Sequence, residues 1–233
     1  MVYNFFTSVF FLFFAFTTPA ITTNNTTAST ETTAVSAEMA AYNTLDANSF
    51  AMPEFESFEK AVHGYNILKA QGKIKKEILT LVDFSKSSNT KRLWIIDMKA
   101  NKVLYNTLVA HGRNSGNEFA TQFSNSNSSN MSSLGFYTTG EIYMGKHGES
   151  MKLDGLEPGF NSNARSRAVV MHAADYVCES FAKQHQRIGR SLGCPALPNA
   201  LNKEIIHLIK NKSCLFIYHP TQKYLNSSKL LAA

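Results

Sequence analysis

The chain has 233 residues, enough for one domain of good size or two small ones, and a net charge of +6. Its 12 Gly and 6 Pro follow no period, so collagen-like and low-complexity chains are excluded. Its 3 Cys leave one thiol over, which excludes a disulfide scaffold, and its basic residues are scattered rather than gathered in the stripe of a nucleic-acid binder.

The first predicted element is an apolar N-terminal segment that holds 7 of the 17 Phe. Residues 5–16 are interrupted only by Thr7 and Ser8; this run is too short for a transmembrane helix but typical of a secretory signal. Thr18-Pro-Ala20 then offers a small-x-small cleavage site. We therefore expect a signal peptide at 1–20 and export to the periplasm or cell envelope. A buried N-terminal strand or helix is the alternative.

A Thr/Ser/Asn-rich stretch at 21–49 follows, and it has too few apolar residues to pack, so we expect a flexible linker. From Pro53 onward, apolar residues recur at helical spacing: Phe55, Phe58, Val62, Tyr65 and Leu68. Acidic residues come early in this segment and lysines late, which complements the helix dipole. We predict an N-terminal helix within 50–76.

After this helix the pattern changes to that of strands separated by turns. The remaining elements are expected in this order: strands at 78–84, 93–98, 103–111 and 168–172, helices at 174–184 and 199–210, and a closing strand at 215–218. A long polar stretch at 112–133 interrupts them, and loops of that length are usually functional or disordered. The pattern predicts a mainly β (α+β) domain with short helices.

The three thiols stand in different settings. Cys178 falls within a predicted helix and Cys214 opens an apolar strand, so each is either a buried small hydrophobe or half of a bridge formed in an oxidising compartment. Cys194 follows Gly193 in a turn that leaves backbone N–H groups free to bind an oxyanion. Arg190 adds positive charge that favours the thiolate. The alternative is a structural Cys in a tight turn.

His172 ends the strand predicted at 168–172, 22 positions before Cys194. A Cys nucleophile needs a base within hydrogen-bond reach, and that base needs an acceptor that orients it. A His at a strand end and a Cys on a turn are a common way to build such a pair. We therefore hypothesise that Cys194 and His172 form a nucleophile and its base.

The segment from His172 to Cys194 resembles the signature of the L,D-transpeptidase (YkuD-like) family: a His, a spacer and then Ser/Thr-His-Gly-Cys. In this chain 18 residues separate His172 from Ser191-Leu-Gly-Cys194. Other blocks are similar to the branch of murein L,D-transpeptidase catalytic domain proteins typical of Bacteroidetes-like bacteria: Val109-Ala-His-Gly-Arg-Asn-Ser-Gly116, Ser133-Leu-Gly-Phe-Tyr137, Gly145-Lys-His-Gly148, Leu153-Asp-Gly-Leu-Glu157, Gly159-Phe-Asn161 and Gly193-Cys-Pro-Ala-Leu-Pro198. The resemblance covers about residues 55–218.

The resemblance implies a YkuD-like β-sandwich catalytic domain with a few helices, preceded by an N-terminal helix, and a site in a cleft under a lid. The chain then divides into five parts: a signal peptide at 1–20, a flexible linker at 21–49, an N-terminal helix within 50–76 packed on the catalytic domain, the L,D-transpeptidase catalytic domain at 77–225 and a tail at 226–233. The segments at 112–133 and 135–159 are the candidate cleft wall and lid.

The resemblance also implies acyl transfer from peptidoglycan stem peptides. Cys194 would attack the carbonyl of the third stem residue and release the terminal D-Ala, while His172 would move the protons. The side-chain amine of a second stem would then form a 3→3 cross-link, or water would give a carboxypeptidase. No metal or cofactor is implied, and we expect a monomer.

Several further residues are assigned to this site. The carbonyl of Ala173 would orient the His172 ring, the N–H groups of Gly193 and Cys194 would bind the oxyanion, and Ser191 belongs to the same motif. The candidate substrate-binding residues are Arg190, His111, His147, Tyr137, Arg165 and Arg167. The arginines would meet substrate carboxylates, which suit the planar fork of a guanidinium.

Two departures from the family pattern keep alternatives open. Leu192 stands where the broad family has His, and Ala196 where much of it has Asn. One alternative is therefore a catalytically impaired peptidoglycan-binding module of the same fold. Another is an exported L,D-carboxypeptidase or Cys peptidase, in which His207 or His219 would be the base. A sortase-like arrangement is excluded because no Arg follows Arg190.

Overall fold

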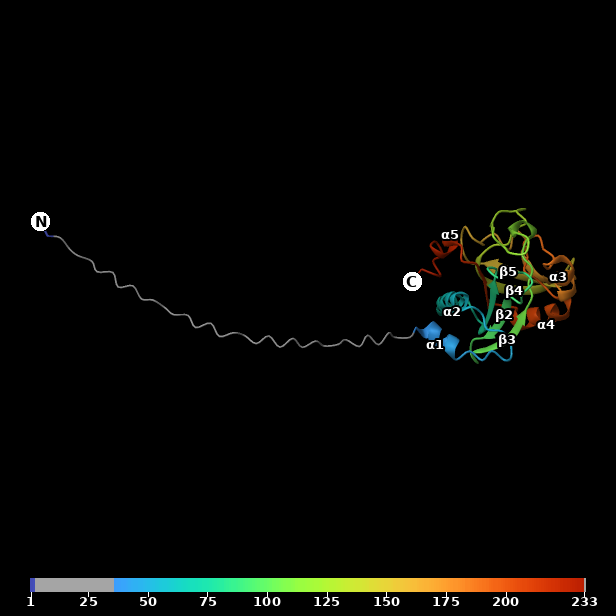
Figure 1. Ribbon diagram of the computed structural model, residues 1–233, viewed down its shortest axis with the longest axis horizontal. Coiled ribbons are helices and arrows are strands. Elements are labelled where there is room, and N and C mark those ends of the chain that lie inside the picture. The colour runs from blue at the N-terminus through green and yellow to red at the C-terminus, as the bar shows by residue number, and fades with distance from the viewer. Residues whose placement is uncertain (3–35, 233) are drawn as a thin grey trace. The chain divides into compact units, whose positions relative to one another are not determined.

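The computed structural model describes residues 1–2 and 36–232 (Figure 1). The chain divides into two units, Met1–Ala34 and Val35–Ala233, and the fold below is that of the second. The predicted signal peptide at 1–20, beyond its first two residues, and the predicted linker up to residue 35 lie outside the described residues. No helix within 36–232 is long and apolar enough to cross a membrane.

The described residues of the second unit form short helices and eight strands. The helices are α1 (Ala37–Asn43), α2 (Phe55–Ala70), the 3-10 turn η1 (Arg113–Ser115), α3 (Glu179–His185), α4 (Asn199–Ile209) and α5 (Gln222–Leu225). The strands are β1 (Ile78–Asp83), β2 (Leu93–Asp97), β3 (Lys102–Thr107), β4 (Gly135–Gly145), β5 (Gly148–Gly155), β6 (Val170–Ala173), β7 (Ala196–Leu197) and β8 (Cys214–Tyr218).

The strands are hydrogen-bonded in one series, in the order β3-β2-β1-β8-β4-β5-β6-β7. β1 pairs in parallel with β8, and β6 with β7, while the other neighbours are antiparallel. β1 and β8 are buried along nearly their whole length, because their residues are mainly large and apolar. The predicted mainly β class with short helices is confirmed, and the expected sandwich takes the form of one continuous series of strands.

Two helices cover the strands. α2 packs on β1 and β8 through the apolar stripe expected from its sequence, in which Phe58, Val62 and Leu68 are buried. α4 packs on β4, β5 and β6 through Ile205 and Ile209. In the view of Figure 1 the labelled strands lie between α2 and α4. The long apolar side chains of both helices therefore complete the core around the sheet.

Two segments differ from their predicted structure. The helix predicted at 174–184 begins only at Glu179. The reason is tertiary: the carbonyl of Tyr176 accepts a hydrogen bond from the N–H of Gly189 at 2.8 Å, so it is engaged outside any helical turn. The candidate lid at 135–159 is mostly regular structure, because β4 and β5 pair along most of it as a long antiparallel hairpin.

The start of the described unit is more ordered than expected. Residues 36–49 belong to the predicted flexible linker, yet they contain α1, which packs on α2. The hydroxyl of Tyr42 donates to the carbonyl of Pro53 at 2.9 Å, and the Tyr42 ring meets that of Phe58 edge-on at 5.3 Å between centroids. This aromatic contact stabilises α1 in a segment whose composition is otherwise polar.

The C-terminal residues also pack on the core, where a free tail was expected at 226–233. The hydroxyls of Tyr224 and Ser228 donate to the buried carboxylate of Glu157, which also accepts from the N–H of Phe136 at 2.6 Å. Burial raises the pKa of Glu157, and these three donors supply the hydrogen bonds that a buried carboxylate requires. Hydrogen bonds to Glu157 therefore hold the C-terminal segment next to β4.

A tight contact between α2 and β4 gives a test of this packing. A Cβ added at Gly64 would lie 2.1 Å from the ring of Phe136, which itself stacks on Phe216 at 4.1 Å between centroids. We expect Gly64→Ala to lower the free energy of unfolding by about 1–3 kcal/mol, despite the higher helix propensity of Ala, because the core is overpacked. Urea denaturation of the full chain measures this.

The matched control is Asn66→Ala, on the exposed face of the same helix. It removes a residue of lower helix propensity without entering the core, so stability is unchanged or slightly raised. A Gly64→Ala variant as stable as the Asn66→Ala variant would contradict the packing of α2 on Phe136.

Candidate active site

The shortest strand of the sheet brings the two hypothesised catalytic residues together. β7 pairs in parallel with β6, with His172 opposite Ala196. Cys194 lies two residues before Ala196, on the turn that leads into β7. The N–H of Val170, also in β6, lies 3.4 Å from the Cys194 sulfur. The nucleophile and the base of the hypothesis therefore occupy neighbouring positions on adjacent segments.

The other side of the Cys194 segment is held by the residues that follow β3. The strand predicted at 103–111 ends at Thr107, because the chain then crosses to the cysteine loop. There the N–H of Ala110 donates to the carbonyl of Ala196 at 2.9 Å. The N–H of Ser191 donates to the carbonyl of His111, also at 2.9 Å. Backbone bonds thus fix the loop on the side away from β6.

Ser191 and Gly193 shape the turn that presents the thiol. The Ser191 hydroxyl accepts from the N–H of Gly193 at 3.0 Å and donates to the carbonyl of Cys194 at 2.6 Å. Gly193 has a φ of +125°, a conformation that favours glycine, and a Cβ there would lie 2.8 Å from the carbonyl oxygen of Met131. The sequence therefore needs Gly at this position for two separate reasons.

This turn changes the predicted oxyanion site. The N–H of Gly193, expected to bind the oxyanion, is already engaged by Ser191. The N–H of Cys194 has no acceptor within the described part of the chain. A carbonyl oxygen held next to the sulfur would therefore find the Cys194 N–H as its available backbone donor, with Gly193 serving the geometry of the turn.

His172 is oriented as a base. Its Nδ1 lies 2.8 Å from the carbonyl oxygen of Ala173, which can only accept, so Nδ1 carries the proton and Nε2 keeps its lone pair. The residue is buried, and burial lowers its pKa. Its ring also stacks on that of His147, with 4.5 Å between centroids and 20° between planes. At neutral pH the ring is therefore an uncharged imidazole ready to accept a proton.

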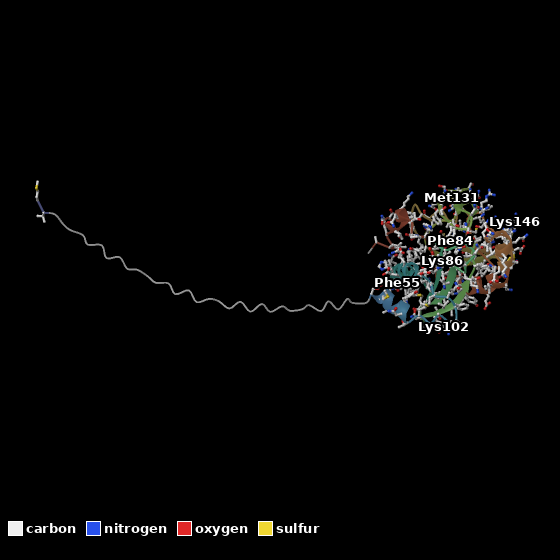
Figure 2. The ribbon with its side chains drawn as sticks, viewed as in Figure 1. Phe55, Phe84, Lys86, Lys102, Met131 and Lys146 are labelled. Atoms are coloured by element: carbon white, nitrogen blue, oxygen red, sulfur yellow. The ribbon has the colours of Figure 1, made fainter. Side chains whose placement is uncertain are left out.

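His147 lies at the tip of the β4–β5 hairpin, which reaches the site from a distant part of the sequence. Figure 2 labels its neighbour Lys146, at the right of the view, and Met131 of the polar stretch, at the top. Of the candidate substrate-binding residues, His147 is the one that the structure places directly on the base. The hairpin tip and the polar stretch therefore supply two separate parts of the site's surroundings.

The thiol is in a partly buried setting. Burial raises the pKa of Cys194, while the N–H of Val170 and the charge of Arg167 act in the opposite direction. A raised thiol pKa and a lowered imidazole pKa mean that the pair rests as neutral thiol and neutral imidazole. A pair in this state can attack a carbonyl only with transfer of the thiol proton to a base, which is general-base chemistry.

Arg190 and His111 hold a loop rather than facing the thiol. The Arg190 Nη1 donates to the carbonyl of Gly116 at 3.0 Å and to the Asn117 side chain at 2.8 Å. His111 is buried beside Arg92, whose Nη2 lies 2.7 Å from its Nδ1, and burial with that positive charge lowers the pKa of His111 to about 4. Both residues support the backbone around η1, and their role in substrate binding stays a prediction.

Arg92 is a buried charge that sequence reasoning missed. It lies just before β2 and is fully buried, and it donates to the carbonyls of Val109 and Lys86. The only sequence signal is an arginine at the start of an apolar strand, which does not reveal the partner. Ser132, also missed, accepts from the N–H of Gly112 at 3.0 Å and donates to the carbonyl of Gly193 at 3.1 Å.

The three remaining candidates for substrate binding lie in three different environments. Tyr137 is fully buried and donates to the carbonyl of Ser133 at 2.8 Å, so it is a core residue and does not line the site. Arg165 is paired with Asp154 and Glu141 at the surface. Arg167, two residues later, bonds to the polar stretch next to Gly193.

The alternative bases are placed elsewhere. His207 pairs with Glu149 at 2.8 Å, and His219 contacts the hydroxyl of Thr221 at 2.6 Å. All three cysteines are free, so the possible Cys178–Cys214 bridge is absent from the described residues. Leu192, two residues before Cys194, is 64% exposed. An exposed apolar side chain on the cysteine turn therefore stands where the broad family has His.

No group of three or more His, Cys, Asp or Glu side chains among residues 36–232 is placed to hold a metal ion. The groups gathered at Cys194 are instead those of nucleophilic acyl transfer: a thiol, an oriented imidazole, an available N–H and a nearby guanidinium.

The family model for the L,D-transpeptidase catalytic domain matches residues 51–218 of the chain. No curated protein matches the chain.

Solved structures of L,D-transpeptidases are among those that match. One from Mycobacterium smegmatis is 13% identical, with 61% of this chain and 59% of that chain covered and a TM-score of 0.38. One from Stackebrandtia nassauensis is 11% identical, with 70% and 67% covered and a TM-score of 0.38. A mutant from Enterococcus faecium is 15% identical, with 62% and 50% covered and a TM-score of 0.37. The chain thus spans 59% of the first of these.

The electrostatic difference between the thiols gives a test of the site. Hydrogen bonds from the Ser180 hydroxyl and the Phe181 N–H lower the pKa of Cys178, whereas burial raises that of Cys194. We therefore expect the rate of iodoacetamide labelling to rise with pH at Cys178 first and at Cys194 later, because the thiolate is the reactive form. Peptide mass spectrometry of samples labelled across a pH series measures both profiles in one protein.

Cys214 is the internal control, since it is fully buried in β8 and is expected to stay unlabelled while the protein is folded. A Cys194 profile that rises at the same pH as that of Cys178, or at a lower one, would contradict the desolvated thiol.

Proposed function

The chain belongs to the L,D-transpeptidase catalytic domain family, and we propose that it is a cysteine-dependent peptidoglycan L,D-transpeptidase with Cys194 as its nucleophile. Members of the family act on peptidoglycan stem peptides, and the domain indicates an acyltransferase. The observation that supports the proposal most is the β6–β7 pair: His172 lies opposite Ala196, two residues from Cys194, and the N–H of Val170 contacts the Cys194 sulfur.

In the proposed reaction the Cys194 sulfur attacks the carbonyl carbon of the third stem residue, and the thiol proton passes to His172 Nε2. The developing oxyanion accepts from the Cys194 N–H, near the charge of Arg167. The C–N bond to the terminal D-Ala then breaks, and the leaving amine takes the proton from His172. A thioester remains on Cys194.

The second half reverses the proton path. An incoming amine loses a proton to His172 Nε2 as its nitrogen attacks the thioester carbon. The C–S bond then breaks, and the leaving sulfur takes that proton from His172, which restores the thiol. With the side-chain amine of another stem as acceptor the product is a 3→3 cross-link. With water the same steps give an L,D-carboxypeptidase.

The proposal includes a cellular setting. The apolar segment at 1–20 is proposed to direct export to the periplasm or cell envelope, where peptidoglycan is found. We also propose that the chain acts as a monomer and that it belongs to the murein L,D-transpeptidase branch of Bacteroidetes-like bacteria, on the sequence blocks that it shares with that branch. The proposal requires no metal or cofactor, since each proton and charge in the scheme is assigned to a protein group.

Exposure of Leu192 beside the nucleophile favours one second candidate, a peptidoglycan-binding module that keeps the fold without turnover. An apolar side chain on the cysteine turn cannot donate the hydrogen bond that the family His could supply. The two candidates differ in whether Cys194 becomes acylated.

Acylation by a carbapenem, a mimic of the substrate's acyl group, tests the proposal directly. We expect intact-mass spectrometry of the purified protein with meropenem to show one added inhibitor molecule. Cys194→Ala abolishes the adduct, and His172→Ala slows its formation by about 100-fold or more, because the proton acceptor is lost. A wild-type protein whose mass does not change would support the binding module instead.

The control for these variants is His207→Ala, because His207 lies in an exposed pair with Glu149 and is not part of the site. Its acylation rate is expected to equal that of the wild type. A loss of acylation in this variant equal to that of His172→Ala would support the Cys peptidase alternative with His207 as base.

The lowered pKa of His172 sets the acid limit of the reaction. Burial stabilises the neutral ring, which is the form that accepts the thiol proton, so this form persists below the ordinary histidine pKa of about 6.5. We expect the acylation rate to fall on acidification only at a pH below that value. Stopped-flow or quenched-flow measurement of the acylation rate across a pH series shows where the rate falls on acidification. A midpoint of that fall above pH 6.5 would contradict the buried neutral base.

A further inference from the structure

The side-chain hydrogen bonds of Arg167 among the described residues all go to one stretch of chain. Its Nη1 donates to the carbonyl of Ser124 at 2.7 Å and to the Ser133 hydroxyl at 3.0 Å. Its Nη2 donates to the carbonyl of Met131 at 2.7 Å and to the Ser129 hydroxyl at 3.1 Å. We call residues 124–133 the arginine loop. One guanidinium therefore binds both ends of this loop and two residues between them.

The same point touches the cysteine turn. A Cβ at Gly193 would lie 2.8 Å from the Met131 carbonyl oxygen and 3.5 Å from Arg167 Nη2. The hydroxyl of Ser132, inside the arginine loop, donates to the Gly193 carbonyl at 3.1 Å. The Arg167 guanidinium and the arginine loop thus both lie against Gly193, the residue that precedes Cys194.

The charge of Arg167 is not neutralised there. Its partners are carbonyls and hydroxyls, and it forms no ion pair with a carboxylate among the described residues. A partly buried cation without a counter-ion favours a negative charge nearby. Arg167 Nη2 lies close to Gly193, so the Cys194 sulfur, or the oxyanion next to it, is a group in its neighbourhood that becomes negative during the proposed reaction.

We propose that Arg167 is a positioning residue for Cys194. The arginine loop holds the guanidinium beside the cysteine turn, where its charge stabilises the thiolate and the oxyanion. The inference rests on the proposed function only in naming Cys194 as the nucleophile.

The other titratable groups around the sulfur do not supply this charge. His172 of β6, with His147 stacked on it, is neutral when it acts as base, and Tyr176 faces the thiol with a pKa raised by burial and by Cys194. Arg190 directs its Nη1 to Gly116. Arg167 is accordingly the cation whose charge lowers the pKa of Cys194 against the larger effect of burial.

Arg165 provides a matched control in the same segment. It lies two residues before Arg167, but it is paired with Asp154 and Glu141 in an exposed cluster. Exposed ion pairs contribute little to stability, so removing Arg165 leaves the core and the cysteine turn in place. Any effect specific to Arg167 therefore cannot be attributed to the loss of a positive charge from this segment as such.

The test compares Arg167→Gln, Arg167→Lys and Arg165→Gln with the wild type in two measurements that need no substrate. The first is the pH profile of iodoacetamide labelling at Cys194. Below the wild-type midpoint, labelling of Arg167→Gln is expected to be about tenfold slower, as for the loss of one nearby opposite charge, and the profile moves to higher pH. Arg165→Gln keeps the wild-type profile.

The second measurement is hydrogen–deuterium exchange of the arginine loop. Arg167→Gln and Arg167→Lys are both expected to exchange faster at 124–133, because neither has the planar fork that holds two carbonyls at once. Arg167→Lys retains a charge and is expected to recover part of the labelling shift. A purely structural role would give the same labelling profile for Gln and Lys.

Should Arg167→Gln fail to fold, Ser133→Ala and Ser129→Ala each remove one hydroxyl partner of the guanidinium and carry the same two expectations in smaller degree. Unchanged labelling profiles in all folded variants would overturn the inference, and so would faster loop exchange without any shift. Absence of carbapenem acylation together with a shifted labelling profile would overturn the proposed function while leaving the role of Arg167 standing.

Discussion

The site depends on the register of one short parallel pair, β6 with β7. Alternate residues of these strands face two different apolar clusters. Met171 and Leu197 belong to the main core, whereas Ala196, opposite His172, packs in a small cluster with Ala110 and other residues. A slip of one residue would turn His172 into the core and an apolar residue toward Cys194, so burial on both faces fixes the register strongly. The two residues of β7 thereby fix the position of His172 relative to the cysteine turn.

Around this pair the protein uses arginines bound to neutral acceptors. Arg92 and Arg190 hold the backbone around η1, and Arg167 holds the loop at 124–133, each through carbonyls, hydroxyls or amides. A carboxylate paired with a cation cancels most of its charge for the surrounding groups. Neutral carbonyl, hydroxyl and amide acceptors carry no net charge, so the positive charge still acts on its neighbours. Of these arginines, Arg167 is the one whose charge acts on Cys194, which suits the proposed reaction through an anionic intermediate.

Burial has two opposed consequences at Cys194 and His172. It raises the pKa of the thiol and lowers that of the imidazole, so the resting pair is uncharged. A neutral thiol is less open to oxidation, because susceptibility follows thiolate character. The cost is that the thiolate must form at the moment of attack, with the proton moving to His172. Orientation of the ring by Ala173 and stabilisation by nearby donors are therefore more important here than a low resting pKa.

The sequence by itself determined the mainly β class, α2 and α4, and it singled out Cys194 and His172 as the candidate pair, because apolar periodicity and a spaced motif are local signals. It assigned Arg165 and Arg167 the same role, and it placed Tyr137, Arg190 and His111 among substrate contacts. Only the tertiary structure separated them, since two arginines two residues apart point to different surroundings: one to surface carboxylates, the other to a loop forty residues away in the chain. Partners so distant leave no local pattern, and the fold alone decides which guanidinium lies beside the sulfur.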